Sequence, residues 1–264
     1  MWALRHPAER AALPPLAGWT DARVVATLCA VAGVVAAAGV IPAAAAAVIA
    51  VGAVHGGMLA VALIWSGLPV ARAAEPILLL TAARAGVAFH PLGALAYLVV
   101  PLWLAREARA GRLARLELGP PWPWGPVTVG ALAGVGLALH LIACASRTLG
   151  YVVRVDASEV VPALAYDVGA NVVSAELFFR GALLHHVWRR SSFALALASA
   201  SVAAALRYCL DPFVATTELR VGAAVYMTML AILNGVLCRW SGSLLPGLAA
   251  AAIFFACYRL LSNG

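Results

Sequence analysis

The chain has 264 residues, of which 64% are hydrophobic and only 11% are charged. A soluble domain carries about a quarter of its residues as charges, so this composition excludes a water-soluble globule and indicates an integral membrane protein. The formal net charge is +7, and all 18 basic residues are arginine. These arginines lie at the ends of apolar runs, which fits the positive-inside rule and not a nucleic-acid-binding face.

A helix needs about 20 mostly apolar residues to cross the roughly 30 Å of bilayer hydrocarbon. Runs of suitable length predict an all-α bundle of seven or eight spans in one membrane domain. They lie near residues 24–41, 43–68, 86–104, 124–146, 160–184, 193–209, 221–238 and 243–258. A shorter apolar piece, 76–83, precedes Arg84 and is interpreted as a re-entrant or half-length segment.

Arginine-rich segments set the expected orientation. The segment after the third predicted span contains four arginines, which places it in the cytoplasm: Arg106, Arg109, Arg112 and Arg115. Two crossings later the chain reaches Arg189 and Arg190, and two more bring it to Arg239, so both positions are again cytoplasmic. Within the span 124–146, Gly130 and Gly134 have GxxxG spacing, which predicts the close approach of a neighbouring helix.

Polar residues concentrate in the predicted span 160–184. Charged side chains inside a membrane cost about 2.5–3.5 kcal/mol on insertion scales and are candidates for function. This span contains Asp167, Asn171, Glu176 and Arg180. Glu176 and Arg180 are four residues apart, so a helix brings them to one face, where they can pair. The pair is either a structural ion pair or part of a functional site.

Two segments resemble one known family. The segment AELFFRGALLHHVWRR, residues 175–190, looks like the first motif, EExxxR, of the CPBP (Abi) intramembrane endopeptidases, whose relatives include the CAAX prenyl endopeptidases. The segment RWSGSL, residues 239–244, resembles that family's turn before its last core helix. The resemblance covers about residues 124–260. It implies N-terminal helices and a basic cytoplasmic loop in 1–123 and CPBP-like core helices in 124–264.

The resemblance carries over only part of the family's site. Family members are thought to use the first Glu of the motif to activate water, and that position is Ala175 here. The second motif, FxxxH, falls at Ala203 and Arg207, so arginine stands where histidine is expected. Glu176 and Arg180 match, and the resemblance implies that they are the supporting pair.

The later His and Asn of the family's last core helix fall near Ala251 and near Phe254 or Phe255. Ala175, Arg207 and Ala251 therefore lack the expected catalytic side chains, and two functions remain open. One is an endopeptidase that cleaves near the C-terminus of a membrane-anchored or sorting-signal-bearing protein, with Glu176 or His140 as a substitute base. The alternative is an inactive pseudoprotease that binds a peptide, lipid or partner protein.

Arg207 also suggests an anion site. Guanidinium binds carboxylate and phosphate bidentately, so Arg207, with Arg180 and Asn234 as further polar candidates, is predicted to bind a peptide C-terminus or lipid phosphate. The competing interpretation is an Arg207–Asp211 pair at a span end, since these residues are four apart. Asn234 is equally explained by a hydrogen bond between helices.

Other signatures are missing from the sequence. It has no HExxH for a zinc protease, and no metal or dissociable cofactor is predicted. We expect the partners to be the lipid bilayer and a membrane-anchored protein or peptide, with no nucleic acid. The expected location is the bacterial inner membrane.

Overall fold

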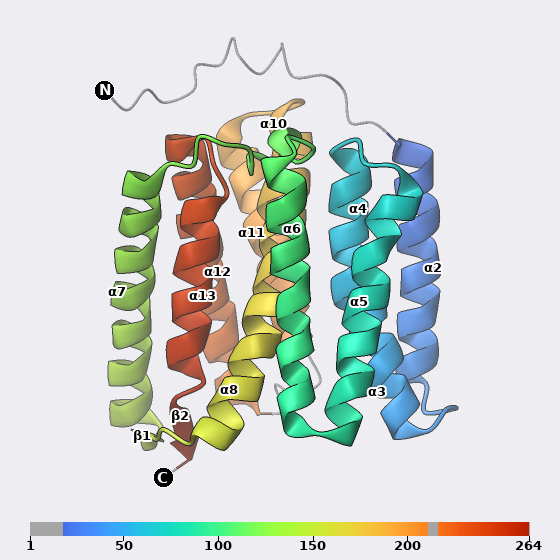
Figure 1. Ribbon diagram of the computed structural model, residues 1–264. Coiled ribbons are helices and arrows are strands. Elements are labelled where there is room, and N and C mark those ends of the chain that lie inside the picture. Colours follow the sequence, from blue (N-terminus) through green and yellow to red (C-terminus); the bar gives the residue numbers. More distant parts are fainter. Residues whose placement is uncertain (1–17, 211–215, 264) are drawn as a thin grey trace. The chain divides into compact units, whose positions relative to one another are not determined.

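The structure, a computed structural model, describes residues 18–210 and 216–263. Most of these residues lie in helices, and one short pair of antiparallel strands is the only sheet among them (Figure 1). Within the described ranges, four helical stretches are long and apolar enough to cross a membrane: Trp19–Ala37, Ala43–Trp65, Trp124–Thr148 and Thr217–Ser241. The prediction of an all-helical fold with helices that are candidates to span a membrane is therefore confirmed, and the number of seven or eight spans stays a prediction.

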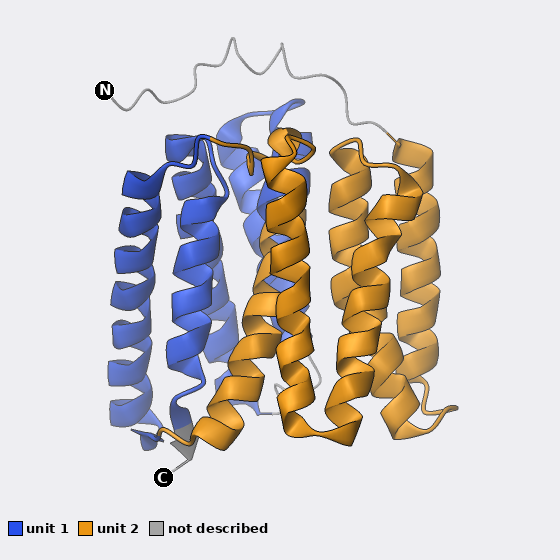
Figure 2. Ribbon diagram, in the orientation of Figure 1, with its two compact units in different colours: residues 1–15, 121–154, 179–264 blue, residues 16–120, 155–178 orange. Residues whose placement is uncertain are grey.

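The chain divides into two compact units (Figure 2). Unit 1 comprises Met1–Pro15, Pro121–Arg154 and Phe179–Gly264, and unit 2 comprises Leu16–Pro120 and Val155–Phe178. The division after residue 123 that the family resemblance implies stays a prediction.

The described part of unit 2 contains seven α-helical elements, one of which is a single turn, and several 3-10 and π-helical segments. Its α-helices are α2 (Trp19–Ala37), α3 (Ala43–Val51), α4 (Gly57–Trp65), α5 (Val70–Phe89), α6 (Val99–Arg109) and α8 (Ala157–Tyr166), followed by the single turn α9 (Val173–Ala175). The 3-10 segments are Pro91–Leu98 and Ala114–Leu116, and the π-helical segments are Gly52–Gly56 and Asp167–Val172. A further π-helical segment, Glu176–Leu184, begins in unit 2 and ends in unit 1.

The segment around Arg84 differs from the sequence prediction. Helix α5 is continuous over 20 residues, through Pro76 and past Arg84, where a half-length segment was expected. The chain breaks instead at His90, because Pro91 follows it and restricts the preceding residue to extended backbone. The predicted span 86–104 is therefore shared between the end of α5, the 3-10 segment Pro91–Leu98 and α6.

Among its described residues, unit 1 contains four helices that follow the predicted runs closely, a short helix and two strands. They are α7 (Trp124–Thr148), β1 (Tyr151–Val153), α10 (His185–Trp188), α11 (Phe193–Cys209), α12 (Thr217–Ser241), α13 (Leu245–Tyr258) and β2 (Leu261–Asn263). Side-chain caps fix two of the starts, since Ser192 accepts from the amide of Leu195 and Thr216 from that of Leu219, each at 3.2 Å.

The predicted GxxxG contact is confirmed in unit 1. Helices α7 and α13 pack side by side (Figure 1). A Cβ atom at Gly130 would lie 2.2 Å from the carbonyl oxygen of Pro246, and one at Gly134 would lie 2.5 Å from that of Ala250. Only glycine allows this approach, because any side chain would overlap the backbone of α13.

Candidate functional site

Two π-helical segments of unit 2 bring buried polar side chains together. π-Helical turns are rare and occur frequently at functional sites. The segment Gly52–Gly56 carries His55, and the segment Asp167–Val172 lies just before Ser174. Gly56 and Gly57 let two neighbouring helices approach His55, since a Cβ atom at either position would lie 2.8 Å from Ile77 or Cys29.

The His55 imidazole lies between two hydroxyl groups. Its Nδ1 is 3.0 Å from Oγ of Ser174, and its Nε2 is 2.6 Å from the hydroxyl of Tyr166. His55 is 4% exposed and Ser174 is fully buried. Both contacts join helices that are more than 100 residues apart in sequence, so this polar network ties α8 and α9 to the π-helical segment Gly52–Gly56.

The hydrogen-bond directions in this network follow from the donors available. The Ser174 hydroxyl donates to the carbonyl of Asn171 at 3.1 Å, so its Oγ is left to accept from Nδ1–H of His55. In that tautomer Nε2 accepts from the hydroxyl of Tyr166. The Ser174 proton is then directed to a backbone carbonyl and not to the imidazole. In an activated serine nucleophile the hydroxyl donates to the base, so Ser174 is not arranged as one.

More polar groups continue the network along the same helix. The side-chain amide of Asn171 donates to Oδ1 of Asp167 at 3.2 Å, and Asp167 is fully buried. The ring of Tyr166 meets that of Tyr97 edge to face at 5.4 Å between centroids. The backbone of Tyr97 lies against Gly169, where a Cβ atom would lie 2.4 Å from its carbonyl oxygen.

The matching pair of the family motif, Glu176 and Arg180, lies on the π-helical segment Glu176–Leu184. Glu176 is 3% exposed and Arg180 is 4% exposed. The guanidinium of Arg180 lies 5.9 Å from the ring centroid of its neighbour Phe179. Burial of two charged residues on one turn agrees with a paired role, and that pairing stays a prediction.

The remaining predicted site residues lie on three helices of unit 1. On α7, Nδ1 of His140 is 2.9 Å from the hydroxyl of Tyr226, and Sγ of Cys144 is 3.8 Å from its ring nitrogens. On α11, the guanidinium of Arg207 lies 4.2 Å from the ring centroid of Tyr208. On α12, Asn234 is fully buried. The proposed partner of Arg207, Asp211, lies outside the described residues.

Apolar side chains occupy the positions where the family motifs expect polar ones. Ala175 is 2% exposed, Ala251 is 1% exposed and Phe254 is 1% exposed. Within unit 1 the rings of Phe254 and Phe255 meet edge to face at 5.7 Å, and they contact Tyr226 and Tyr208 at 6.2 and 5.7 Å. These four rings form an aromatic cluster around the end of α13.

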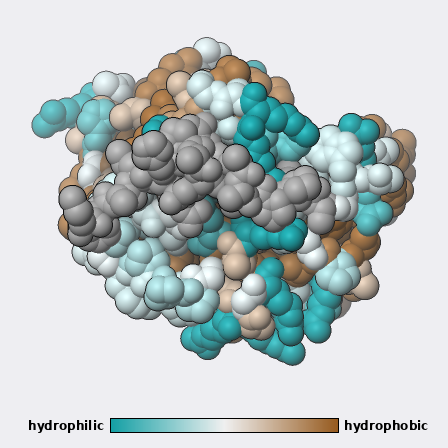
Figure 3. All heavy atoms as spheres, turned by 90° about the horizontal axis from the view of Figure 1, so that it is seen from above, coloured by the Kyte–Doolittle hydropathy of each residue, from teal (hydrophilic) through white to brown (hydrophobic). Residues whose placement is uncertain are grey.

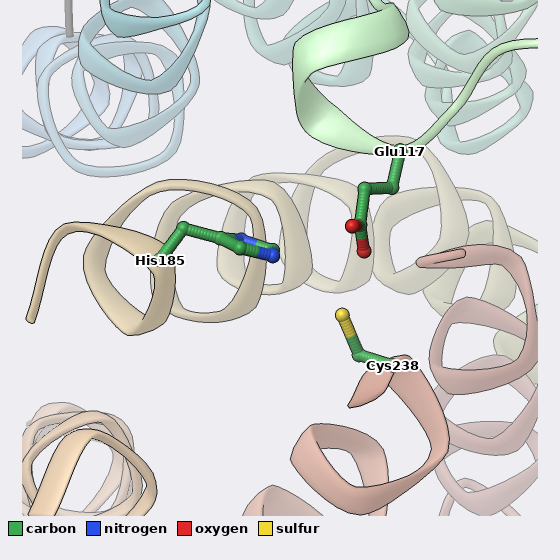
Figure 4. Close-up of side chains that lie close together, drawn as sticks. All are labelled: Glu117, His185 and Cys238. Carbon is green, nitrogen blue, oxygen red and sulfur yellow. The ribbon is translucent and has the colours of Figure 1, made fainter. Parts of the chain in front are cut away.

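Unit 1 also brings together two side chains that can bind a metal. A ring nitrogen of His185 and Sγ of Cys238 lie within 4.8 Å of each other (Figure 4). Glu117, the third side chain drawn there, belongs to unit 2. Two donors are fewer than the three or four protein ligands of zinc sites, and the expected absence of a metal stays a prediction.

A charged cluster lies where α5 begins and α6 ends, both in unit 2. Glu107 is fully buried, and its two oxygens accept from Arg72 at 3.2 Å and Arg112 at 2.7 Å. Glu75 accepts from the indole of Trp103 at 2.8 Å. Hydrophilic side chains lie among apolar ones in the view onto this end of the molecule (Figure 3). The placement of the arginine-rich loop at the cytoplasmic membrane surface stays a prediction.

Sequence reasoning missed His55 as a site residue. Its signal was present, because GAVHGG places one imidazole between glycines inside an apolar run. Tyr166 and Ser174 carried no signal of their own, since their role depends on a partner far away in the sequence. No family model, curated protein or solved structure matches the chain.

Proposed function

We propose that this chain is an integral inner-membrane protein of the CPBP type that has lost the family's peptide-bond hydrolysis. It holds a peptide, lipid or partner protein within the membrane. The shorter apolar helices α11 and α13, the predicted span 160–184 and the segment Pro91–Arg109 would add to the four long spans. They would bring the total to eight, the upper number predicted from the sequence.

One observation carries this proposal: apolar packing at the positions where the family resemblance expects the base and its partners. A general base, an oxyanion donor and a positioned water are jointly needed to hydrolyse a peptide bond. Ala175 cannot accept a proton, and the aromatic cluster of Phe254 and Phe255 fills the end of α13 in unit 1. A buried aromatic pair excludes the water that the reaction consumes.

A second candidate is an endopeptidase in which Glu176 replaces the base. Its support is the burial of Glu176, which follows Ala175 directly and begins a π-helical segment, where side chains are rotated from their usual α-helical positions. His140 is a weaker substitute, since its ring already contacts the Tyr226 hydroxyl and the Cys144 thiol.

Mapping the C-termini of membrane proteins by mass spectrometry separates the two candidates. The cells compared lack the protein or carry wild type, Glu176→Gln or Ala175→Glu at equal levels. We expect the same termini with wild type as without the protein. We also expect Ala175→Glu to add none, because the positions at Ala251 and Phe254 remain apolar. Termini that appear with wild type and disappear with Glu176→Gln would overturn the scaffold proposal and establish Glu176 as the base.

A further inference from the structure

Helix α7 of unit 1 carries a thiol and an imidazole one turn apart on an accessible face. Sγ of Cys144 lies 3.8 Å from both ring nitrogens of His140. The contacts of a catalytic base are often this long in the absence of substrate and shorten when substrate binds. His140 is exposed and Cys144 is half-exposed, so a molecule dissolved in the membrane can reach both side chains.

The hydroxyl of Tyr226, on α12, holds the imidazole in position. It lies 2.9 Å from Nδ1 of His140, while the Tyr226 side chain is 8% exposed and stacks on the ring of Phe254 at 6.2 Å between centroids. With the imidazole proton on Nδ1, that N–H donates to the Tyr226 oxygen, and Nε2 is left to accept the proton of the Cys144 thiol. A nucleophile beside a base that a third group orients is the arrangement used in covalent catalysis.

The position of Cys144 along α7 suits a substrate at the membrane interface. The helix has 25 residues and is therefore about 37 Å long, slightly more than the roughly 30 Å of bilayer hydrocarbon. Cys144 lies four residues, about 6 Å, before its last residue, Thr148. In a spanning helix of this length the thiol is close to one interface, where the ester carbonyls of membrane lipids lie.

The residues on either side of the thiol and imidazole match the order of groups in an acyl lipid. Arg147 is exposed one turn after Cys144, where a charged headgroup would lie. One turn before His140, Gly136 has no atom within 4 Å of the position of a Cβ. Met229, on α12, adds an apolar side chain that is 44% exposed. A headgroup, a carbonyl and an acyl chain can therefore lie in sequence along this face.

We propose that Cys144 is a nucleophile that accepts a long-chain acyl group from an ester or thioester in the membrane, with His140 as its base. The thiol proton passes to Nε2 of His140, and the sulfur attacks the acyl carbonyl. A carbon–sulfur bond forms and the bond to the alcohol or thiol of the donor breaks. His140 then returns the proton to that leaving group. The products are S-acylated Cys144 and the free alcohol or thiol, so no oxidant is needed.

A second half-exposed thiol of unit 1 lacks this arrangement. Cys209, the last residue of α11, lies 3.8 Å from the carbonyl oxygen of Arg220 and contacts no imidazole among the described residues. It is therefore the matched control for the reactivity of an accessible cysteine. The proposed acylation involves neither Ala175 nor Glu176, and it does not depend on the proposed loss of peptide hydrolysis.

Acyl labelling of the purified full chain in detergent micelles tests the site. The donors are a palmitoyl thioester and a phosphatidylglycerol, each with an alkyne at the end of its acyl chain, which a fluorescent azide detects. Neutral hydroxylamine cleaves thioesters and leaves oxygen esters intact, and mass spectrometry of peptides locates the label. The variants are Cys144→Ser, His140→Gln and Tyr226→Phe, with Cys209→Ser as the control.

We expect a hydroxylamine-sensitive label on Cys144 of wild type, at a rate at least about 100-fold above that of Cys209, because a positioned base contributes about 10²–10⁴-fold. His140→Gln should remove most of this difference, and Cys144→Ser should carry no hydroxylamine-sensitive label. Cys209→Ser should be labelled like wild type. Labelling by the thioester alone would identify a soluble activated donor, and labelling by phosphatidylglycerol would identify a lipid ester.

Tyr226 is a positioning residue, so its effect should pass through His140. Tyr226→Phe should lower the maximal labelling rate about tenfold and leave the donor concentration at half-saturation unchanged. In the background of His140→Gln it should have no further effect. A merely structural role would lower labelling in both backgrounds.

The absence of label with both donors would overturn the proposal. So would equal labelling of Cys144 and Cys209 in wild type, which would indicate the general reactivity of accessible thiols and requires no variant. An unchanged rate in His140→Gln would exclude His140 as the base. A thermal melt of each variant verifies its fold before labelling is compared.

Discussion

Nε2 of His55 lies 2.6 Å from the hydroxyl of Tyr166, across 111 residues of sequence. The same imidazole reaches Ser174 through Nδ1, so both of its nitrogens are satisfied inside an apolar unit. A histidine with both nitrogens paired can be buried at modest cost, whereas one unpaired nitrogen costs about 1–3 kcal/mol. Unit 2 therefore depends on both hydroxyls.

Tyr166→Phe should destabilise unit 2 by about 1 kcal/mol, because it leaves Nε2 of His55 buried without a donor. In the background of His55→Leu the same substitution should have almost no effect, which gives a coupling of about 0.6 to 1.7 kcal/mol. Unfolding in mixed detergent and SDS micelles measures the four free energies. Equal effects of Tyr166→Phe in both backgrounds would show that the 2.6 Å contact contributes nothing to stability.

The helices predicted most accurately are those whose apolar runs are uniform and bounded by caps. α11 was predicted over 193–209 and is found there, because Ser192 caps its start and its one charged residue, Arg207, lies in the last turn. The prediction failed between 76 and 104, where Arg84 was interpreted as a break. Pro91 is the actual break, and Arg84 is tolerated inside α5.

The candidate site was predictable only where its residues are neighbours in sequence. Glu176 and Arg180 can be recognised in the sequence because two charged residues lie four positions apart within an apolar run. The π-helical geometry on which they lie depends on packing, so no local pattern predicted it. The network around His55 joins residues whose proximity is a property of the fold, and a lone histidine in a span does not indicate its partner.

The contact between α7 and α13 should be the part of unit 1 that is most sensitive to added volume. Gly134→Val places a side chain 2.5 Å from the carbonyl of Ala250 and should cost about 1–3 kcal/mol or prevent folding. Gly136→Val is the matched control, because no atom lies within 4 Å of a Cβ at Gly136, two residues further along the same helix. Thermal melts in detergent compare the two, and similar losses would refute the packing argument.

Glu107 should be the most important acidic residue for the stability of unit 2. Glu107→Gln removes the charge that pairs with Arg72 and Arg112, and it should cost about 1–3 kcal/mol, since the two arginines are half-exposed and can be rehydrated. Glu159→Gln, at an exposed position on α8, should change stability by less than about 0.5 kcal/mol. The free energy of unfolding of both variants is measured in detergent. An equal loss in the two variants would show that the ion pairs of Glu107 do not stabilise unit 2 more than an exposed carboxylate does.

His186, at the end of the helix that carries the family motif, should make stability depend on pH. Burial lowers its pKa below the usual 6.5, and the charges of Arg190 and Arg189 lower it further. The unfolded chain then binds the proton more readily than the folded one. Stability is therefore full above the unfolded pKa and falls as the pH drops from there toward the folded pKa.

Arg190→Gln should raise the pKa of His186 toward 6.5, because it removes the guanidinium that contacts Nε2. The loss of stability on acidification below about pH 6.5 should become smaller in this variant. An NMR titration of the His186 ring protons reports the pKa directly, and Arg220→Gln, on the exposed start of α12, serves as the charge control. An unchanged titration in Arg190→Gln would mean that burial and Arg189, without Arg190, set the pKa of His186. The acid sensitivity should then persist, because a buried imidazole still resists protonation without its arginine neighbour.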